Sequence, residues 1–269
     1  MGNGQNALLK VLTPRREISR ALGISAGAMI AGLIFLFWCV LTYGELVDTT
    51  FCPPPHRVLL ALWKVLADGS LFRHAWSSLI VINTGFFLSS LVAIPLGIMM
   101  GSFRIVAAAL EPMVNFIRYL PVTSMIPLLI LWIGIGLEEK VAVIFIGTFF
   151  QQIVMFADVS AQVPDELFSA GYTLGASRRQ VVMKVLLPAT LPGVMDVLRV
   201  TMGWAWTYLV VAELVASNSG LGYMSMQAMR GLHADLIFVA ILVIGFLGMV
   251  TDQIFKWIKA IWLPWAGQR

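Results

Sequence analysis

The chain has 269 residues, of which 59% are hydrophobic and only 12% are charged, and its formal net charge is +4. Soluble domains carry about 25% charged residues, so this balance excludes an ordinary soluble protein and predicts an integral membrane protein. In such a protein a positive charge reflects basic loops held on one face of the membrane, so we do not expect nucleic acid as a partner.

Six apolar runs are candidates for membrane crossing, which takes about 20 residues. They are residues 23–43, 75–101, a stretch within 105–137, 141–157, 193–215 and 236–258. The first run is too long for the core of a signal peptide and no clear cleavage site follows it, so we expect an uncleaved span. The third is too long for one upright helix and contains Glu111, Arg118, Pro121 and Pro127, so its first half is expected at the interface or against other helices. The predicted fold class is all-α, a polytopic bundle of about six transmembrane helices.

Basic residues predict the orientation, because they translocate poorly and stay in the cytoplasm. With both termini inside, the cytoplasmic set is Lys10, Arg15, Arg16, Arg20, Arg104, Arg178, Arg179, Lys184, Lys256, Lys259 and Arg269. The external set is Arg57, Lys64, Arg73, Lys140 and Arg230. The domain prediction is a cytoplasmic segment 1–22, a transmembrane domain 23–258 with a loop at 164–188, and a cytoplasmic tail 259–269.

Sites for chemistry are not evident in the sequence. Cys39 and Cys52 are too few and too poorly placed for a disulfide scaffold, so two free thiols are expected. His56, His74 and His233 are scattered, which gives no metal-site pattern. The chain has no G-x-x-x-x-G-K-[ST] run, and so no P-loop for ATP, and no constellation for nucleophilic catalysis. We predict a non-catalytic protein without a cofactor of its own.

One polar insert, DELFSAGYTLGASRRQVVMKVLLPATLP (165–192), separates the fourth and fifth apolar runs. Leu167, Ala170, Gly171 and Leu174 recur at helical spacing, which predicts a short amphipathic helix lying on the membrane surface. Gly175 allows a turn. Ser177 followed by Gln180 has the pattern of a capping box, which predicts a second helix running to about Leu187, with Pro188 and Pro192 marking the next span. Composition alone leaves open a basic interfacial loop that has no partner.

Ionisable residues in or beside the apolar runs are costly unless they are paired or hydrated, so we expect them to face the bundle interior. They are Glu111, Arg118, Asp158, Asp196, Arg199, Glu213 and Asp252. Asp196 and Arg199 are three residues apart and are predicted to pair with each other.

The stretch SAGYTLGASRRQVVMKVLLP resembles the EAA loop of permease subunits of ATP-binding-cassette (ABC) importers. Ala170, Gly175, Leu187 and Pro188 match that pattern at the family's spacing. Ser169 replaces the family's glutamate and Gly171 its second alanine.

Further stretches resemble one subgroup, the binding-protein-dependent permeases for taurine, aliphatic sulfonates, nitrate and bicarbonate. They are CPPPHRVLLAL (52–62), RYLPVTSMIPLLILWIGIGLEEK (118–140), GWAWTYLVVAELVASNSGLGYM (203–224) and LPWAG (263–267).

The resemblance implies that the loop is a coupling helix seated in a groove of a cytoplasmic ATPase. The residues implied in this coupling are Glu166, Leu167, Ser169, Ala170, Gly171, Leu174, Gly175, Ala176, Arg178, Arg179 and Pro188. Implied partners are a second permease copy, two ATPase subunits that hold ATP and Mg²⁺, and a periplasmic or lipid-anchored binding protein docking near residues 217–233. The implied location is the bacterial cytoplasmic membrane.

The implied function is ATP-driven import of a small oxyanion, taurine or another sulfonate first, then nitrate, then bicarbonate. Candidates for the translocation path are Gln151, Gln152, Trp204, Trp206, Thr207, Tyr208 and Glu213, although aromatic residues at helical spacing usually serve packing or interfacial anchoring. A pyrimidine-precursor importer remains open. So does an ATP-independent channel or secondary transporter, for which we find no convincing internal repeat.

Overall fold

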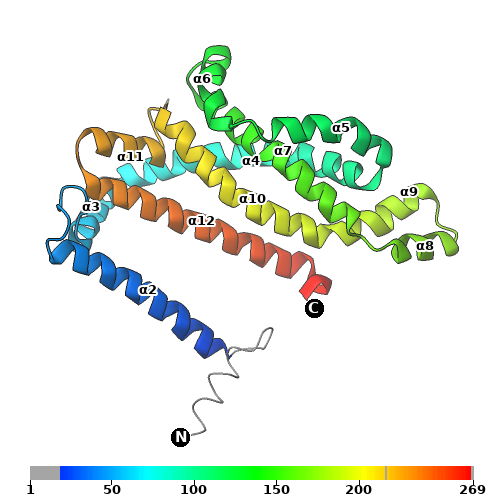
Figure 1. Cartoon of the computed structure of the whole chain (residues 1–269), viewed down its shortest axis with the longest axis horizontal. Coiled ribbons are helices and arrows are strands. Elements are labelled where there is room, and N and C mark those ends of the chain that lie inside the picture. The colour runs from blue at the N-terminus through cyan, green and yellow to red at the C-terminus, as the bar shows by residue number, and fades with distance from the viewer. Residues whose placement is uncertain (1–18, 216, 268–269) are drawn as a thin grey trace, which may run out of the picture. The chain divides into compact units, whose positions relative to one another are not determined.

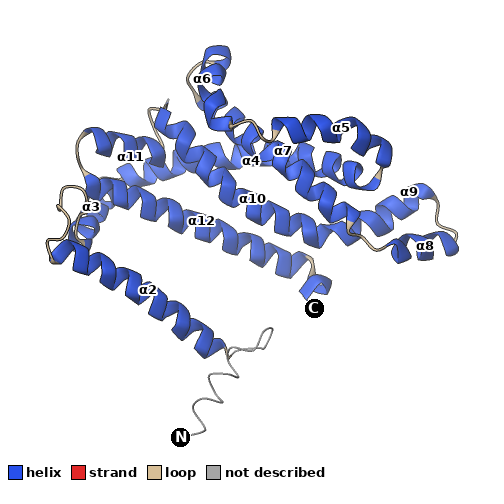
Figure 2. Ribbon diagram, viewed as in Figure 1, coloured by secondary structure: helices blue, strands red, loops and turns tan. Residues whose placement is uncertain are grey.

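The computed structural model describes residues 19–215 and 217–267, and every regular element in those residues is a helix (Figures 1 and 2). The predicted all-α class is therefore confirmed. Lys10, Arg15, Arg16, Arg269 and most of the predicted segment 1–22 lie outside the described residues. The chain divides into two compact units, Met1–Leu60 and Ala61–Arg269, with the boundary inside one helix, α3 (Pro55–Ala67).

The first unit contains the first predicted span as helix α2 (Arg20–Tyr43), which is apolar enough to cross a membrane. Ser19 caps it by accepting a hydrogen bond from the Leu22 N–H. After α2 the chain folds back on itself, because the Trp38 indole N–H donates to the Pro53 carbonyl at 3.1 Å and the Tyr43 hydroxyl lies 2.8 Å from His56 Nδ1. Cys39 and Cys52 are free thiols, as the sequence predicted.

The second unit holds the remaining spans. Its helices after α3 are α4 (Ser70–Ser102), α5 (Arg104–Ile117), α6 (Val122–Ile133), α7 (Leu137–Ala161), α8 (Asp165–Thr173), α9 (Arg178–Val181), a π-helical stretch (Val182–Leu186), α10 (Leu187–Val215), α11 (Leu221–Arg230), α12 (Ala234–Trp262) and a 3-10 turn (Pro264–Gly267).

Helices α4 and α7 form the most extensive pair in this unit and run in the same direction, since successive glycines of α4 meet successive residues of α7. Glycines bring their backbones together: a Cβ on Gly85 would lie 3.0 Å from the Val141 carbonyl oxygen, and one on Gly97 would lie 2.7 Å from that of Ile153. Small residues at such positions are the usual means of close helix packing in membranes. Because the two helices are parallel, the chain between them must return along the bundle.

That return is made by α5 and α6, which are bent by 91° at the break between them. Counted together as one broken span, they bring the candidate spans in the described residues to six, with α2 included. The predicted third span is therefore two helices. Only Val114 of α5 is buried, so this helix lies along the side of α4 and α7, in keeping with the expectation for the first half of 105–137.

One expectation about the fifth span was wrong, because the helical chain does not break near Leu187. Residues Arg178–Val215 instead form one helical span that includes the π-helical stretch and runs through Pro188 and Pro192. In the π-turn the Leu187 N–H donates to the carbonyl of Val182, five residues back. Because a proline lacks an N–H and crowds the preceding turn, this wider turn lets the helix continue into Pro188.

The predicted pair of Asp196 with Arg199 is also wrong, because each side chain reaches across to α12. Arg199 Nε lies 2.9 Å from Asp252 Oδ1, and Lys259 Nζ lies 2.6 Å from Asp196 Oδ2. Helix α12 packs beside α10 and offers both partners, so these contacts tie two helices together. Glu111, Asp158 and Asp196 are exposed in the single chain, contrary to the expected inward orientation.

Candidate functional site

Residues 164–188 form a bent surface element, which we call the elbow, at one end of the second unit (Figure 1). Helix α8 ends in a Schellman motif: the Gly175 N–H donates to the Tyr172 carbonyl at 2.9 Å and the Ala176 N–H to the Gly171 carbonyl at 3.0 Å. Gly175 has φ of +79°, a left-handed conformation that glycine adopts without strain. The predicted turn at Gly175 is confirmed.

The second arm of the elbow begins with the predicted capping box. The Gln180 N–H donates to Ser177 Oγ at 3.4 Å, and the Ser177 N–H donates to Gln180 Oε1 at 2.8 Å. This arm continues without interruption into the span that ends at Val215. The elbow is therefore joined to that span by one continuous helix.

The two faces of α8 differ. Its inner face lies on the bundle through Phe168, which packs beside the buried Leu186, and through Gly171, whose added Cβ would lie 3.4 Å from Val181. Its outer face presents Leu167, and Leu174 just after the helix is 88% exposed. The other predicted coupling residues are exposed, apart from the half-buried Ala176 and Pro188; the exposed ones are Glu166, Ser169, Ala170, Arg178 and Arg179. Sequence reasoning missed Phe168, the anchor of α8.

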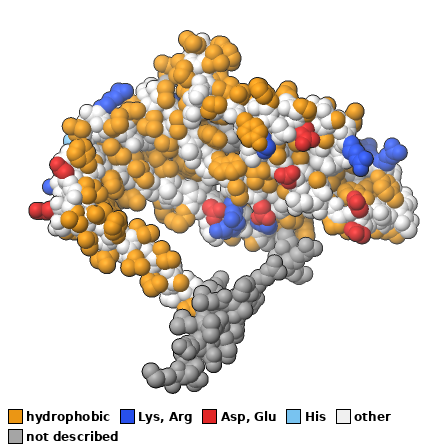
Figure 3. Space-filling view, in the orientation of Figure 1, with side chains coloured by type: hydrophobic (Ala, Val, Ile, Leu, Met, Phe, Trp, Pro, Cys, Tyr) orange, Lys and Arg blue, Asp and Glu red, His pale blue; other side chains and the backbone are white. Residues whose placement is uncertain are grey.

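Lysine and arginine side chains gather over the tip of the elbow, while acidic side chains lie beside them (Figure 3). The acidic residues Asp165 and Glu166 are in the first turn of α8, where they favourably oppose the helix dipole. The elbow thus presents an amphipathic surface, with exposed apolar side chains on one part and charged side chains around them.

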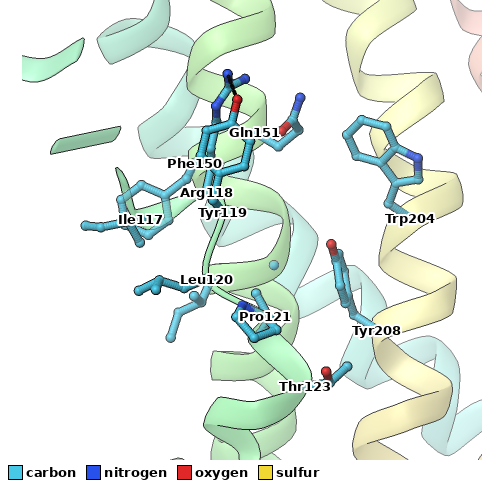
Figure 4. A pocket seen from close by; sticks show the side chains of 13 residues that line it. Ile117, Arg118, Tyr119, Leu120, Pro121, Thr123, Phe150, Gln151, Trp204 and Tyr208 are labelled. Carbon is cyan, nitrogen blue, oxygen red and sulfur yellow. Dashed lines mark hydrogen bonds between the residues drawn. The ribbon is translucent and has the colours of Figure 1, made fainter. Parts of the chain in front are cut away.

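A second candidate site is a cavity of about 490 Å³ beside the bend between α5 and α6, which we call the bend cavity. On one side it is lined by residues from Ile117 to Thr123, and on the other by Trp204 and Tyr208 of α10, with Gln151 of α7 between them (Figure 4). Gly147 of α7 also lines the cavity. The lining residues of α7 lie near the middle of that 25-residue helix, so the cavity lies about halfway along its length.

Among the described residues that line the cavity, Arg118 alone is charged. Its Nη2 donates to the Tyr119 hydroxyl at 2.9 Å, and its guanidinium carbon lies 4.8 Å from the centre of that ring (Figure 4). Its Nε–H is buried and has no acceptor among the described residues. Arg118 is in none of the ion pairs formed by the described residues. The sequence predicted only that Arg118 faces protein, and the bend that brings it to the cavity was not evident.

The predicted path residues divide into two groups. Gln151, Trp204 and Tyr208 line the bend cavity, and no hydrogen bond from their side chains is found within the described chain. Gln152 is fully buried on the opposite side, where its amide joins Ser89, Ser90 and Thr201. The Trp206 indole N–H likewise donates to Thr251 at 3.2 Å. The side chains of Gln151 and Trp204 are therefore free to bind a ligand, whereas those of Gln152 and Trp206 already form hydrogen bonds within the bundle.

Glu213 lies away from the cavity, at the end of the unit opposite the elbow. It is 1% exposed, and its carboxylate accepts from the Ser78 hydroxyl at 2.7 Å and from the Gly222 N–H at 2.8 Å. These bonds fix the start of α11 against α4 and α10. The remaining candidate, Thr207, is exposed on α10 and does not line the cavity.

Residues 93–261 match the family described as "Binding-protein-dependent transport system inner membrane component". That match covers more than half of the chain. The chain belongs to this family. It is a non-catalytic membrane permease subunit of an ABC importer, which works with ATPase subunits and a binding protein.

Similarity to named relatives extends over most of this permease. It is 32% identical to the taurine transport system permease protein TauC of Escherichia coli over 94% of both chains. It is 30% identical to the putative aliphatic sulfonates permease SsuC of Bacillus subtilis, over 90% of this chain and 88% of that one. It is also 30% identical to the formylaminopyrimidine permease ThiX of Halalkalibacterium halodurans, over 79% and 85%.

Solved structures confirm the fold of the permease. The MetNI methionine ABC transporter in an inward-facing conformation matches with a TM-score of 0.60 at 23% identity, over 71% of this chain and 97% of that one. The predicted ABC importer permease fold is therefore confirmed, with a broken third span.

Proposed function

We propose that this permease moves taurine or another small aliphatic sulfonate into the cytoplasm. The observation that carries the proposal is the bend cavity, because the described residues that line it include a guanidinium and no carboxylate, so that the charge of the cavity favours an anion. Similarity over 94% of the chain to a taurine permease supports a sulfonate as that anion. A path also needs an anion to be held weakly, and one cation among neutral donors meets that need.

The proposal includes a cytoplasmic elbow that binds an ATPase. The exposed edge formed by Leu167 and Leu174 would supply the apolar contact, and Arg178 and Arg179 the polar rim. Closure of two ATPase subunits would then displace the elbow as a rigid body and alternate the access of a path shared by two permease copies. Both termini are cytoplasmic in this arrangement, and residues 217–233 face the binding protein.

Substrate uptake tests the proposed cargo. The permease is expressed with its ATPase and binding protein in a strain that lacks sulfonate importers, and uptake of labelled taurine and methanesulfonate is measured. We expect ATP-dependent, saturable uptake of at least one sulfonate. Uptake of formylaminopyrimidine, nitrate or bicarbonate without either sulfonate would refute the cargo but retain the class of importer.

Co-purification tests the class itself. A tagged permease extracted in mild detergent should retain an ATPase, and cross-links from a cysteine at Leu174 should reach that subunit. An elbow that cross-links only from the external face would overturn the arrangement, as would transport that persists without any ATPase.

A further inference from the structure

We propose that the bend cavity is a transient binding site for the oxyanion group of the substrate, with Arg118 as its charged ligand and neutral donors from α7 and α10 around it. The inference rests on the proposed import of a sulfonate and assigns the group that such a substrate would meet within the membrane. Three observations support it: the position of Arg118, the hydrogen-bond donors that have no partner among the described residues, and a described lining without a carboxylate.

The placement of Arg118 is energetically unusual. It lies at the break of a bent crossing, opposite the middle of α7. A cation at such a depth is costly unless it is paired or meets water in a cavity. Three ion pairs join the described charged residues, and none of them includes Arg118. The fold therefore keeps a half-buried cation beside a cavity without an ionic partner among the described residues.

The guanidinium is also incompletely bonded. Tyr119 accepts from Nη2, while the Nε–H is covered and unpaired within the described chain. An unpaired donor on a charged group is destabilising, and a planar guanidinium matches an oxyanion through two parallel hydrogen bonds. A small rotation of Arg118 toward the cavity would let its Nε–H and Nη2–H groups both donate to a bound oxyanion. An anion should therefore gain more binding free energy here than at an arginine whose donors are already paired.

Neutral donors complete the site. The Trp204 indole, the Tyr208 hydroxyl and the Gln151 amide all line the cavity, and none donates to a described residue. In Figure 4 Trp204 and Tyr208 lie across the cavity from Arg118, with Gln151 between the two sides, so a ligand in the cavity would be contacted from both sides. Their near neighbours Gln152 and Trp206 show that this bundle satisfies such groups where no cavity is present.

The position of the site gives it a mechanical consequence. Arg118 belongs to the link between α5 and α6, whereas Trp204 and Tyr208 belong to the helix that continues from the elbow. A displacement of that helix changes the distance between the charged and neutral halves of the site. The anion would be held while the halves are close and released when they separate, which avoids a permanent trap at mid-membrane.

Cysteine labelling tests the site independently of which substrate is carried. In a Cys39→Ser, Cys52→Ser background, Thr123→Cys places a thiol on the cavity wall and Gln227→Cys places a reference thiol on exposed α11. The purified importer in detergent is treated with an anionic methanethiosulfonate (ethylsulfonate) or a cationic one (ethyltrimethylammonium). Relative to the reference thiol, we expect the Thr123→Cys thiol to favour the anionic reagent about tenfold. Methanesulfonate should slow this labelling and glycerol should not.

Arginine variants decide the assignment. Arg118→Gln should remove both the preference for the anionic reagent and the protection by methanesulfonate. Arg104→Gln, which removes the exposed arginine at the other end of α5, should leave both intact. Arg118→Lys keeps the positive charge but loses the paired N–H donors of the guanidinium. It should therefore retain the preference for the anionic reagent and weaken the protection by methanesulfonate. This variant serves as the test if Arg118→Gln does not insert into the membrane. An unchanged preference in Arg118→Gln, or labelling that methanesulfonate does not slow, overturns the site.

Uptake separates the two proposals. If the wild-type importer carries no sulfonate but the labelling pattern holds, the site stands and the proposed cargo fails. If sulfonate uptake is normal and the labelling does not depend on Arg118, the cargo stands and the site fails. If both hold, Arg118→Gln should lower sulfonate uptake at least tenfold while ATP hydrolysis stimulated by the loaded binding protein persists.

Discussion

The elbow and the bend cavity are both built around an interruption of a helix, and the two interruptions are held in different ways. At Gly175 the turn is fixed by backbone hydrogen bonds and a capping box that all lie between Gly171 and Gln180. At the bend, one wall is the short link after Ile117, and the facing walls come from α7 and α10. The elbow is therefore stiff by itself, while the shape of the cavity depends on how the helices pack.

This difference suits the two proposed roles. A lever must keep its shape when it is pushed, and short-range backbone bonds provide that. A path must change shape when the bundle moves, and walls from separate helices allow it. Substitutions in the elbow should therefore affect coupling while the fold survives, and substitutions that repack the helices around the cavity should affect the fold and the path together.

The largest effect is expected from Gly175→Trp. A tryptophan in the left-handed region costs about 1–2 kcal/mol, and its ring would project from the exposed tip where an ATPase would bind. No atom lies within 4 Å of the position of an added Cβ, so the bundle itself is not disturbed. We expect uptake to be abolished while the protein still inserts, measured by transport and by detergent extraction. Gly175→Asn, which tolerates the same conformation, is the matched control, and unimpaired uptake by the tryptophan variant would contradict the role of the elbow.

The next largest effect is expected from Gly147→Ala at the cavity. Its Cβ would lie 2.7 Å from the Tyr208 ring, so the ring or the helix must shift. Such overpacking costs about 1–3 kcal/mol and would displace one wall of the cavity. Thermal unfolding should shift downward and uptake should fall by roughly tenfold. Gly245→Ala on α12 meets no atom within 4 Å and should change neither, so equal effects from the two variants would contradict the packing argument.

Two adjacent glutamines give a smaller and sharper comparison. Gln152→Ala removes hydrogen bonds to Ser89, Ser90 and Thr201, and because such interhelical bonds contribute about 0.6 kcal/mol each, we expect lower thermal stability with an unchanged KM for uptake. Gln151→Ala leaves those bonds in place and removes a cavity donor, so the KM should rise a few-fold at unchanged stability. The reverse pattern would show that the cavity has been placed on the wrong face of α7.

Sequence patterns predicted the elbow well because its determinants are local. Ser177, Gln180 and Gly175 lie within six positions, and each acts through a backbone geometry that depends little on the rest of the chain. The same approach failed at Leu187, where two prolines suggested a helix end but a π-turn carries the helix onward. Proline signals indicate a difficulty for a helix, and tertiary packing decides how it is resolved.

The bend cavity could be predicted only in part. Hydrogen-bond donors on the fourth and fifth spans suggested Gln151, Trp204 and Tyr208, but equally the buried Gln152 and Trp206. The sequence does not show which face of a helix meets a cavity until the neighbouring helices are known. Arg118 was recognised as a costly charge, but its site depends on the 91° bend and on the distant α7 and α10. The pairing of Asp196 failed for the same reason, because its partner Lys259 is 63 residues away.

The smallest effect is expected from Gly171→Ala, which restores the alanine usual in the family's loop. An added Cβ would lie 3.4 Å from Val181 Cγ2 and 3.6 Å from Val185 Cγ2, which is ordinary contact, and alanine is favoured over glycine within a helix by about 1 kcal/mol. The elbow should become slightly more resistant to limited proteolysis, with uptake unchanged within about twofold. An element that transmits a displacement as a rigid body should keep its function when it becomes more rigid. A large loss of uptake would therefore mean that α8 works by bending at Gly171, and the contrast between a stiff elbow and an adaptable cavity would not hold.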